Sequence, residues 1–164
     1  MGAEGQQNAG SWIREFQSEE DAAEAAMLLE QAPEAALWRE TDLRKVRDLA
    51  GVTSLVSITG GRISGMLIGR KVGEEAEILN LAVRPTERRK GEGRRLVERL
   101  LEGYRLGEVS RVFLEVRESN SGAMAFYERL GFHAVGRRKA YYQQPREDAL
   151  VMERGLWKST DTPR

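Results

Sequence analysis

The pattern of hydrophobic and polar positions predicts a three-stranded unit in the middle of the chain. Ser54 to Ile58, Ile63 to Arg70 and Ala76 to Val83 are rich in apolar residues, and two short turns separate them. The turns, Thr59-Gly60-Gly61-Arg62 and Val72-Gly73-Glu74-Glu75, have the length and glycine content of β-hairpin connections. The three runs are therefore predicted to form an antiparallel meander.

A change of period follows the meander. Between Arg94 and Leu106 the apolar positions recur at helical spacing; they are Leu96, Val97, Leu100, Leu101 and Tyr104. Arg111 to Val116 then returns to the alternation of a strand. A strand, a helix and a strand at this spacing predict a right-handed parallel crossover.

The remaining elements are predicted from caps and shorter patterns. Ser11 to Phe16 is predicted as a strand, and Ser18 with Asp21 resembles a capping box that opens a helix to about Gln31. Further helices are predicted at about Thr41 to Leu49 and Ala123 to Leu130, and further strands at about Ala134 to Tyr141 and Ala149 to Gly155.

The length and the two ends of the chain suggest one domain. The 164 residues are 40% hydrophobic and contain no apolar run long enough to cross a bilayer. Met1 to Gly10 is small and polar, without the basic start and apolar stretch of a secretion signal. We therefore expect a flexible tail over residues 1–10, a single domain over 11–157, a second tail over 158–164, no membrane partner and a cytoplasmic location.

Composition removes several kinds of chemistry. There is no cysteine, and His133 is the only histidine, so a disulfide, a thiolate zinc site or a cysteine nucleophile is not expected. No metal is expected for the same reason. The 26 basic and 26 acidic residues balance, so a field of one sign for direct binding of nucleic acid is not expected either.

A glycine-rich basic turn lies between the last strand of the meander and the helix. Gly91 and Gly93 let the backbone approach a ligand, and the helix start offers unpaired amides to a phosphate or pyrophosphate. Basic side chains add positive charge; they are Arg88, Arg89, Lys90, Arg94 and Arg95. The alternative interpretation is a solvated basic helix start whose glycines serve only the turn.

Two familiar phosphate loops do not fit this turn. A nucleotide P-loop ends in Gly-Lys-Ser/Thr, whereas Arg94 and Arg95 follow Gly93, and the dinucleotide motif needs a small residue where Leu96 stands. The pattern Arg/Gln-x-x-Gly-x-Gly/Ala, met by Arg88, Gly91 and Gly93, resembles the pyrophosphate loop of the GNAT acetyltransferases.

This resemblance implies a fold and a cosubstrate. The fold is α+β, α/β/α-layered, with a mixed, mostly antiparallel central sheet flanked by helices and a splayed strand pair that binds acetyl-CoA. The residues implied to bind acetyl-CoA lie on the strand end and the loop; they are Leu81, Ala82, Val83, Arg88, Arg89, Lys90, Gly91, Glu92, Gly93 and Arg94.

A second group of motifs narrows the resemblance. Several segments are similar to those of the ribosomal-protein-alanine N-acetyltransferases; they are Leu114-Glu115-Val116-Arg117, Ser119-Asn120, Arg138, Tyr141-Tyr142 and Glu147-Asp148-Ala149 with Met152. The resemblance implies that Glu115 is the catalytic base, that Tyr127 is the acid and that Asn120 contacts the cofactor. It also implies a protein N-terminus as acceptor, with a small-subunit ribosomal protein as the candidate.

The chemistry of amine acetylation agrees with these roles. An α-amino group has a pKa of about 8, so an acceptor must take its proton before it attacks a thioester at neutral pH. Tyr127, with an ordinary pKa of about 10, keeps a proton for the departing thiolate. Each residue also has a purely structural interpretation. In it, Glu115 pairs with Arg117 or Arg111 on a solvated face of the sheet, and Tyr127 is an aromatic residue packed in the core.

The implied acceptor site contains Trp38, Tyr141 and Tyr142. Asn120 has an alternative role as a helix N-cap, and both tyrosines have one as ordinary strand residues. Ala36-Leu37 replaces a Phe-Pro pair of the family beside Trp38, so a different peptide preference is expected.

The leading function is N-terminal protein acetylation. The alternatives are acetylation of a small-molecule amine and a non-catalytic CoA-binding regulatory domain.

Overall fold

A computed structural model describes residues 10–156, which divide into two compact units. The first unit contains residues 10–70 and 80–102, and the second contains residues 71–79 and 103–156. Apart from Gly10, the two predicted tails lie outside the described residues. The single domain expected over residues 11–157 stays a prediction.

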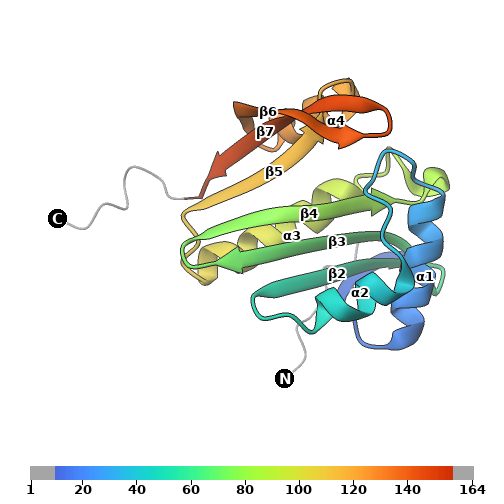
Figure 1. Cartoon of the computed structure of the whole chain (residues 1–164). Helices are drawn as coiled ribbons and strands as arrows, with labels where there is room; N and C mark the ends of the chain where they lie inside the picture. Colours follow the sequence, from blue (N-terminus) through green and yellow to red (C-terminus); the bar gives the residue numbers. More distant parts are fainter. Residues whose placement is uncertain (1–9, 157–164) are drawn as a thin grey trace. The chain divides into compact units, whose positions relative to one another are not determined.

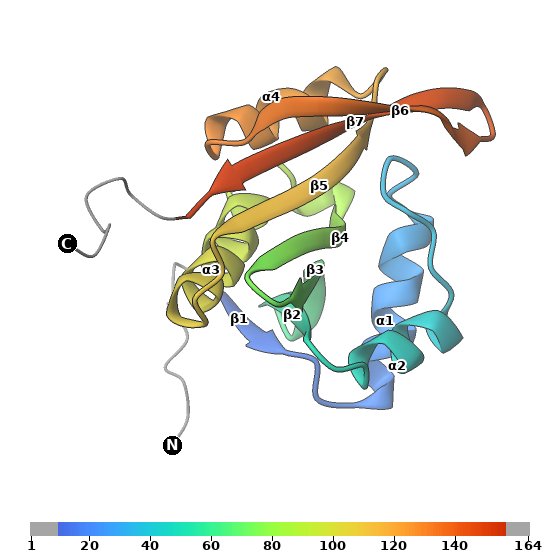
Figure 2. The same ribbon diagram turned by 60° about the vertical axis from the view of Figure 1, so that its left-hand side comes forward.

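The first unit holds the predicted meander. Its elements are β1 (Ser11–Glu15), α1 (Glu19–Glu30), α2 (Glu40–Arg47), β2 (Val52–Thr59), most of β3 (Arg62–Val72), the second half of β4 (Glu75–Val83), the 3-10 turn η1 (Pro85–Glu87) and most of α3 (Glu92–Leu106). β2 pairs antiparallel with both β1 and β3. In this unit α1 and α2 lie on one side of the strands and α3 lies on the other (Figure 2).

Local chemistry explains where α1 begins. The Ser18 hydroxyl accepts from the Asp21 amide at 3.3 Å, and the Asp21 carboxylate accepts from the Ser18 and Gln17 amides, which confirms the predicted capping box. Arg14 of β1 also holds Asp21, at 2.6 Å and 2.8 Å. The Arg14 guanidinium lowers the pKa of the Asp21 carboxyl, so this link between β1 and α1 persists well into the acid range.

The second unit is built on three strands and a helix. They are β5 (Arg111–Arg117), α4 (Ser121–Arg129), β6 (His133–Gln143) and β7 (Arg146–Gly155). β5 pairs parallel with the first half of β4, from Glu75↔Arg111 to Ile78↔Leu114, and β7 pairs antiparallel with β5 and β6. Within the second unit β7 therefore lies between β5 and β6 (Figure 1), and the strand order of the sheet is β1-β2-β3-β4-β5-β7-β6. The predicted mixed, mostly antiparallel sheet and the parallel β4–β5 pairing are confirmed.

Packing of the predicted helical stripe fixes α3. Leu96, Val97, Leu100, Leu101 and Tyr104 are all buried, as predicted. Gly65 of β3 allows close packing against this helix, because an added Cβ would lie 2.7 Å from the Ser57 hydroxyl and 3.1 Å from Leu96. The helix begins at Glu92, two residues earlier than predicted, and so includes Gly93 in its first turn.

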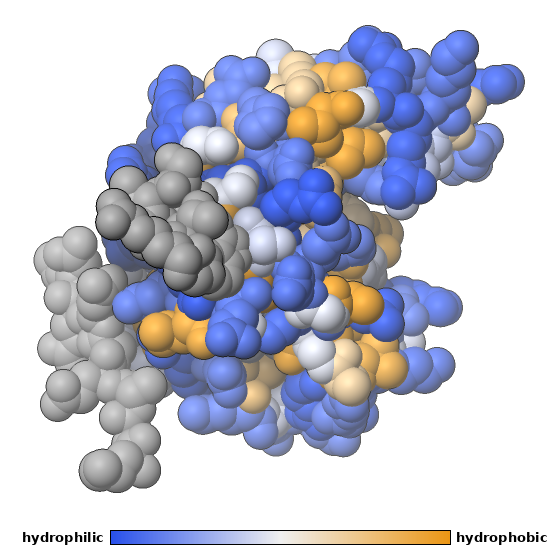
Figure 3. Space-filling model, turned by 90° about the vertical axis from the view of Figure 1, so that its left-hand side faces the viewer, coloured by the Kyte–Doolittle hydropathy of each residue, from blue (hydrophilic) through white to orange (hydrophobic). Residues whose placement is uncertain are grey.

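The surface shows no broad apolar face in the view of Figure 3. There, hydrophobic residues occur in small groups among hydrophilic ones. Within residues 10–156, no helix is long and apolar enough to cross a membrane.

Candidate active site

The glycine-rich loop of the first unit presents backbone donors. The Arg95 amide donates to the Gly91 carbonyl at 3.1 Å and closes the first turn of α3, so Gly91 is the N-cap residue. A helix leaves its first amides without acceptors in the helix, and no hydrogen bond from the amides of Lys90 through Arg94 to another described residue is found. Arg89 and Gly91 have positive φ, 62° and 80°. This backbone fits an anion such as a pyrophosphate.

The basic side chains of the loop are largely engaged with nearby carboxylates. Arg88 donates to the Val83 carbonyl at 3.2 Å and forms an ion pair with Glu34. Lys90 pairs with Glu87 at 3.1 Å, and Arg94 pairs with Glu98 at 2.8 Å. The positive cluster predicted from the sequence is therefore partly neutralised, and the amides are the more available donors.

The side chain of Glu92 anchors the loop to β2. Its side chain is buried, and its carboxylate accepts from the hydroxyls of Ser57 and Thr59, each at 2.8 Å. The Thr59 hydroxyl oxygen also lies 3.0 Å from the Ser64 hydroxyl oxygen. The predicted contact of Glu92 with acetyl-CoA is therefore left to its backbone amide. The anchor was not predicted from the sequence. The signal that could have indicated it is the presence of the hydroxyl residues Ser57, Thr59 and Ser64 in otherwise apolar strands.

The end of β4 also positions the chain between α1 and α2. Leu81 and Val83 are half-buried and Ala82 is buried. Just before them, the buried Asn80 donates its side-chain amide to the Ala36 carbonyl at 2.8 Å. Asn80 therefore fixes the segment that carries the exposed Leu37 and the half-buried Trp38. Of these two residues, Trp38 is the one that the family resemblance assigns to acceptor binding.

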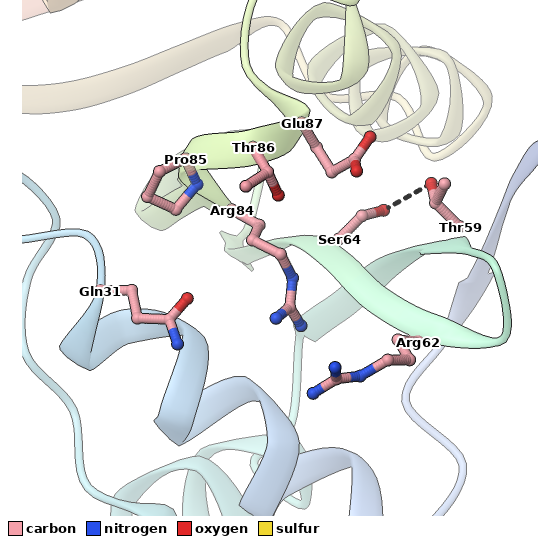
Figure 4. Close-up of a pocket in the computed structure, with 8 residues that line it drawn as sticks. All are labelled: Gln31, Thr59, Arg62, Ser64, Arg84, Pro85, Thr86 and Glu87. Carbon is pink, nitrogen blue, oxygen red and sulfur yellow. Dashed lines mark hydrogen bonds between the residues drawn. The ribbon is translucent and has the colours of Figure 1, made fainter.

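A pocket of about 360 Å³ lies beside η1 in the first unit (Figure 4). Gln31, Thr59, Arg62, Ser64, Arg84, Pro85, Thr86 and Glu87 line it. Arg84 donates to the Ile63 carbonyl at 2.6 Å and lies 3.7 Å from Glu24, and Arg62 lies 3.8 Å from the same carboxylate. Both guanidinium groups thus have partners, and Arg84 ties the start of the loop to β3. No sequence pattern indicated this pocket.

Glu115 lies on β5 of the second unit with its side chain on the less buried face. Val112, Leu114 and Val116 are buried on the other face, as their alternation predicts. A Glu115 carboxylate oxygen lies 2.7 Å from Nε of Arg138, which comes from β6. Hydrogen bonding to the Glu115 carboxylate raises the pKa of the Tyr141 hydroxyl.

The alternative partners predicted for Glu115 are wrong. Arg111 pairs instead with Glu75 and Glu153, and Arg117 pairs with Glu147 at 3.3 Å. Arg138 continues the family pattern in the sequence, but no role in the site was predicted for it. Its contact depends on the register between β6 and β7, which shifts between Arg138 and Tyr142, and no local sequence pattern reports such a shift.

A stacked arginine holds the tyrosine pair. The Arg117 guanidinium lies 4.0 Å from the centroid of the Tyr142 ring and donates to the Pro145 carbonyl. Tyr141 and Tyr142 meet edge to face with ring centroids 5.1 Å apart. Tyr142 is half-buried, whereas Tyr141 is 49% exposed. Of the three predicted acceptor residues, Tyr141 and Tyr142 are therefore brought together with Glu115.

Tyr127 and Asn120 belong to α4 and its cap. Tyr127 is buried and meets Phe126 and Phe132 edge to face, at centroid distances of 5.0 Å and 5.6 Å. Burial raises the pKa of its hydroxyl above the ordinary value, so the group stays protonated at neutral pH. The Asn120 side chain accepts from the Ala123 amide at 3.1 Å, which confirms the predicted N-cap. The packing of Tyr127 also has the features of the core-aromatic alternative.

The chemistry available here comes from carboxylates, hydroxyls and amides. Across the described residues, no group of three or more histidine, cysteine, aspartate or glutamate residues is placed to hold a metal ion. The loop offers amide donors for an anion, and Glu115 offers a partly exposed carboxylate for a cation or a proton.

Comparison with known proteins gives consistent relatives. Over 94 residues the chain is 40% identical to the [Ribosomal protein bS18]-alanine N-acetyltransferase of Escherichia coli K12, covering 56% of this chain and 64% of that protein. It is 38% identical over 100 residues to N-alpha-acetyltransferase RimI of Mycobacterium tuberculosis, covering 58% and 61%. The chain thus spans less than two thirds of the length of these curated relatives.

Structural comparison extends the likeness to nearly the whole chain. The crystal structure of the ribosomal-protein-S18-alanine N-acetyltransferase from Escherichia coli superposes with a TM-score of 0.82 at 28% identity, covering 94% of this chain and 99% of that one. The family model for acetyltransferase (GNAT) proteins matches residues 13–132. The chain, with its glycine-rich loop at the start of α3, therefore belongs to the acetyltransferase (GNAT) family.

Proposed function

We propose that this protein transfers acetyl from acetyl-CoA to the N-terminal α-amine of a protein in the cytoplasm. The observation that carries the proposal is the set of backbone amides from Lys90 to Arg94, which have no acceptor among the described residues, in a chain that belongs to the acetyltransferase (GNAT) family. A pyrophosphate is the anion for which that loop is suited. Arg88 through Arg94 hold it, mainly by backbone, and Leu81, Ala82, Val83 and Asn120 complete the cofactor contacts.

Glu115 and Tyr127 supply the proton transfers in this proposal. Glu115 takes the proton of the acceptor ammonium, directly or through water, and the freed lone pair attacks the thioester carbonyl. The C–S bond then breaks, Tyr127 gives its proton to the departing thiolate, and the second proton lost by the acceptor nitrogen returns to the Tyr127 oxygen, directly or through water. The partly exposed carboxylate of Glu115 and the protonated state of Tyr127 support these roles. Backbone amides at the end of β4 stabilise the negative oxygen of the intermediate.

The relatives support the proposed acceptor class. Two of them are named for acetylation at an alanine of a ribosomal protein and at an α-amine. Tyr141, Tyr142 and Trp38 are the side chains we assign to the acceptor. A small-subunit ribosomal protein with an N-terminal alanine is therefore the first candidate.

Release of CoA thiol over a panel of acceptors tests the proposal. We expect turnover with a peptide that begins with alanine. The matched control is the same peptide with its α-amine blocked and an internal lysine left free, and it should give no thiol. Turnover only with small amines such as polyamines would show that the acceptor is a small molecule and not a protein. Tight CoA binding without any turnover would establish a regulatory domain.

A further inference from the structure

The Glu115 carboxylate is occupied by a cation of the protein itself. Arg138 Nε lies 2.7 Å from Glu115 Oε1, and the guanidinium lies 5.7 Å from the centroid of the Tyr141 ring. A carboxylate beside an aromatic face is a general site for a cation, whether guanidinium or ammonium. The acceptor of the proposed reaction is also a cation before it loses its proton.

Arg138 is held less firmly than the neighbouring arginines. Its side chain is 60% exposed, whereas that of Arg117 is 29% exposed and is fixed by stacking and by the β6–β7 turn. Arg137 bridges two carboxylates, those of Glu118 and Asp148. For Arg138, the contacts found among the described residues are those with Glu115 and Tyr141. An ion pair this exposed is weak and exchanges readily.

We propose that Arg138 is a built-in competitor for the acceptor: its guanidinium occupies the cation position on Glu115, and an incoming ammonium must displace it. This inference rests on the proposed function, because it concerns access to the carboxylate that the reaction uses. Arg138 is a placeholder that does not react, since a guanidinium keeps its proton at any physiological pH. An α-ammonium in the same position can give its proton to Glu115. Arg138 is thus a specificity-determining residue that favours cationic amines able to displace it.

Kinetics of matched arginine variants test this inference. Arg138→Gln removes the competitor, so the KM for the acceptor peptide should fall by about two- to fivefold, the strength of an exposed ion pair, while kcat does not fall. Arg137→Gln is the control and should change neither constant. Arg138→Lys keeps a cation near Glu115 and should leave KM closer to that of the wild type. A lower kcat at unchanged KM would show that Arg138 instead supports Glu115, and would overturn the proposal.

A binding measurement separates this inference from the proposed function. The carboxyl ¹³C resonance of Glu115, assigned with Glu115→Gln, is followed while methylammonium chloride is added to the wild type and to Arg138→Gln. We expect a midpoint about two- to fivefold lower in the variant, with sodium chloride as the ionic-strength control. Equal midpoints overturn the inference even if the protein acetylates peptides. A shifted midpoint supports it even if the acceptor panel shows no turnover, a result that would defeat the proposed function alone.

Discussion

The two compact units contribute candidate sites of opposite construction. In the first unit the loop before α3 offers backbone amides, and three of its basic side chains are paired with Glu34, Glu87 and Glu98. In the second unit Glu115 offers a single side chain, placed by contacts from β6. In a site made of amides, several donors each contribute part of the binding energy, whereas a site made of one carboxylate depends on that carboxylate alone. Substitutions should therefore have unequal effects in the two units.

The largest effect is expected at Glu115. Glu115→Gln keeps the size of the side chain but removes its basicity, so turnover at pH 7 should fall by roughly 10² to 10⁴. The deficit should shrink as pH rises above about 8, because the free amine then becomes abundant without a base. Turnover of both proteins from pH 6 to 10 measures this.

Glu118→Gln is the control for this substitution, because Glu118 is a nearby glutamate that pairs with Arg137. It should leave turnover unchanged across the same pH range. Thermal unfolding of Glu115→Gln should differ little from the wild type, since its ion pair involves an arginine that is 60% exposed. A rate deficit that stays constant from pH 6 to 10 would rule out the base role.

The second effect concerns Tyr127. Tyr127→Phe preserves the edge-to-face packing with Phe126 and Phe132 but removes the proton donor, so turnover should fall by about 10² while acetyl-CoA affinity changes only a few-fold. Tyr104→Phe is a matched control, because Tyr104 is also buried and its hydroxyl has no hydrogen-bond partner among residues 10–156. If both variants keep full turnover, Tyr127 is a core aromatic residue only.

The third effect tests the amide loop. Gly91→Ala forces a side chain into a residue with φ of 80°, so the loop must distort and acetyl-CoA affinity should fall by about tenfold, the loss of one charge-assisted hydrogen bond. Gly73→Ala, in the β3–β4 turn, carries the same kind of strain at φ of 62° and has no atom within 4 Å of its Cβ. It should lower the unfolding temperature similarly and leave affinity unchanged by calorimetry. Equal affinities for the two variants would mean that the loop was wrongly assigned.

The smallest effect is expected from the loop's side chains. Lys90→Ala should weaken acetyl-CoA binding only about two- to fivefold, because Lys90 already pairs with Glu87 and is exposed to solvent. The loss should disappear at high salt. A drop of a hundredfold or more by calorimetry at low salt would show that charge, and not the backbone, holds the anion.

The sequence predicted most of the fold because its determinants are local. Alternation placed Val112, Leu114 and Val116 in the core, and the Ser18–Asp21 box marked the start of α1 within one residue. The loop was found for the same reason, since Arg88, Gly91 and Gly93 are close in the chain. The early start of α3 was missed because the carboxylate of Glu92 finds its partners 33 and 35 residues away.

Long-range side-chain pairs were the part that the sequence could not give. Glu115 was expected to pair with Arg111 or Arg117, which are near in sequence, but each of these meets another carboxylate. Arg138 reaches Glu115 from β6, and a register shift between Arg138 and Tyr142 controls where that side chain lies. Many cross-strand pairings are chemically acceptable, and only the folded register selects one of them.

The irregular register of β6 also bears on how the protein behaves at high concentration. β6 is the last strand in the sheet order, so one of its edges has no partner strand in the described part of the chain. Exposed strand edges recruit further strands and start aggregation, and bulges and basic side chains prevent this. β6 has two register shifts and carries exposed Arg137, Arg138 and Lys139. Replacing these three residues with threonine would therefore turn an edge that repels other chains into one that recruits them.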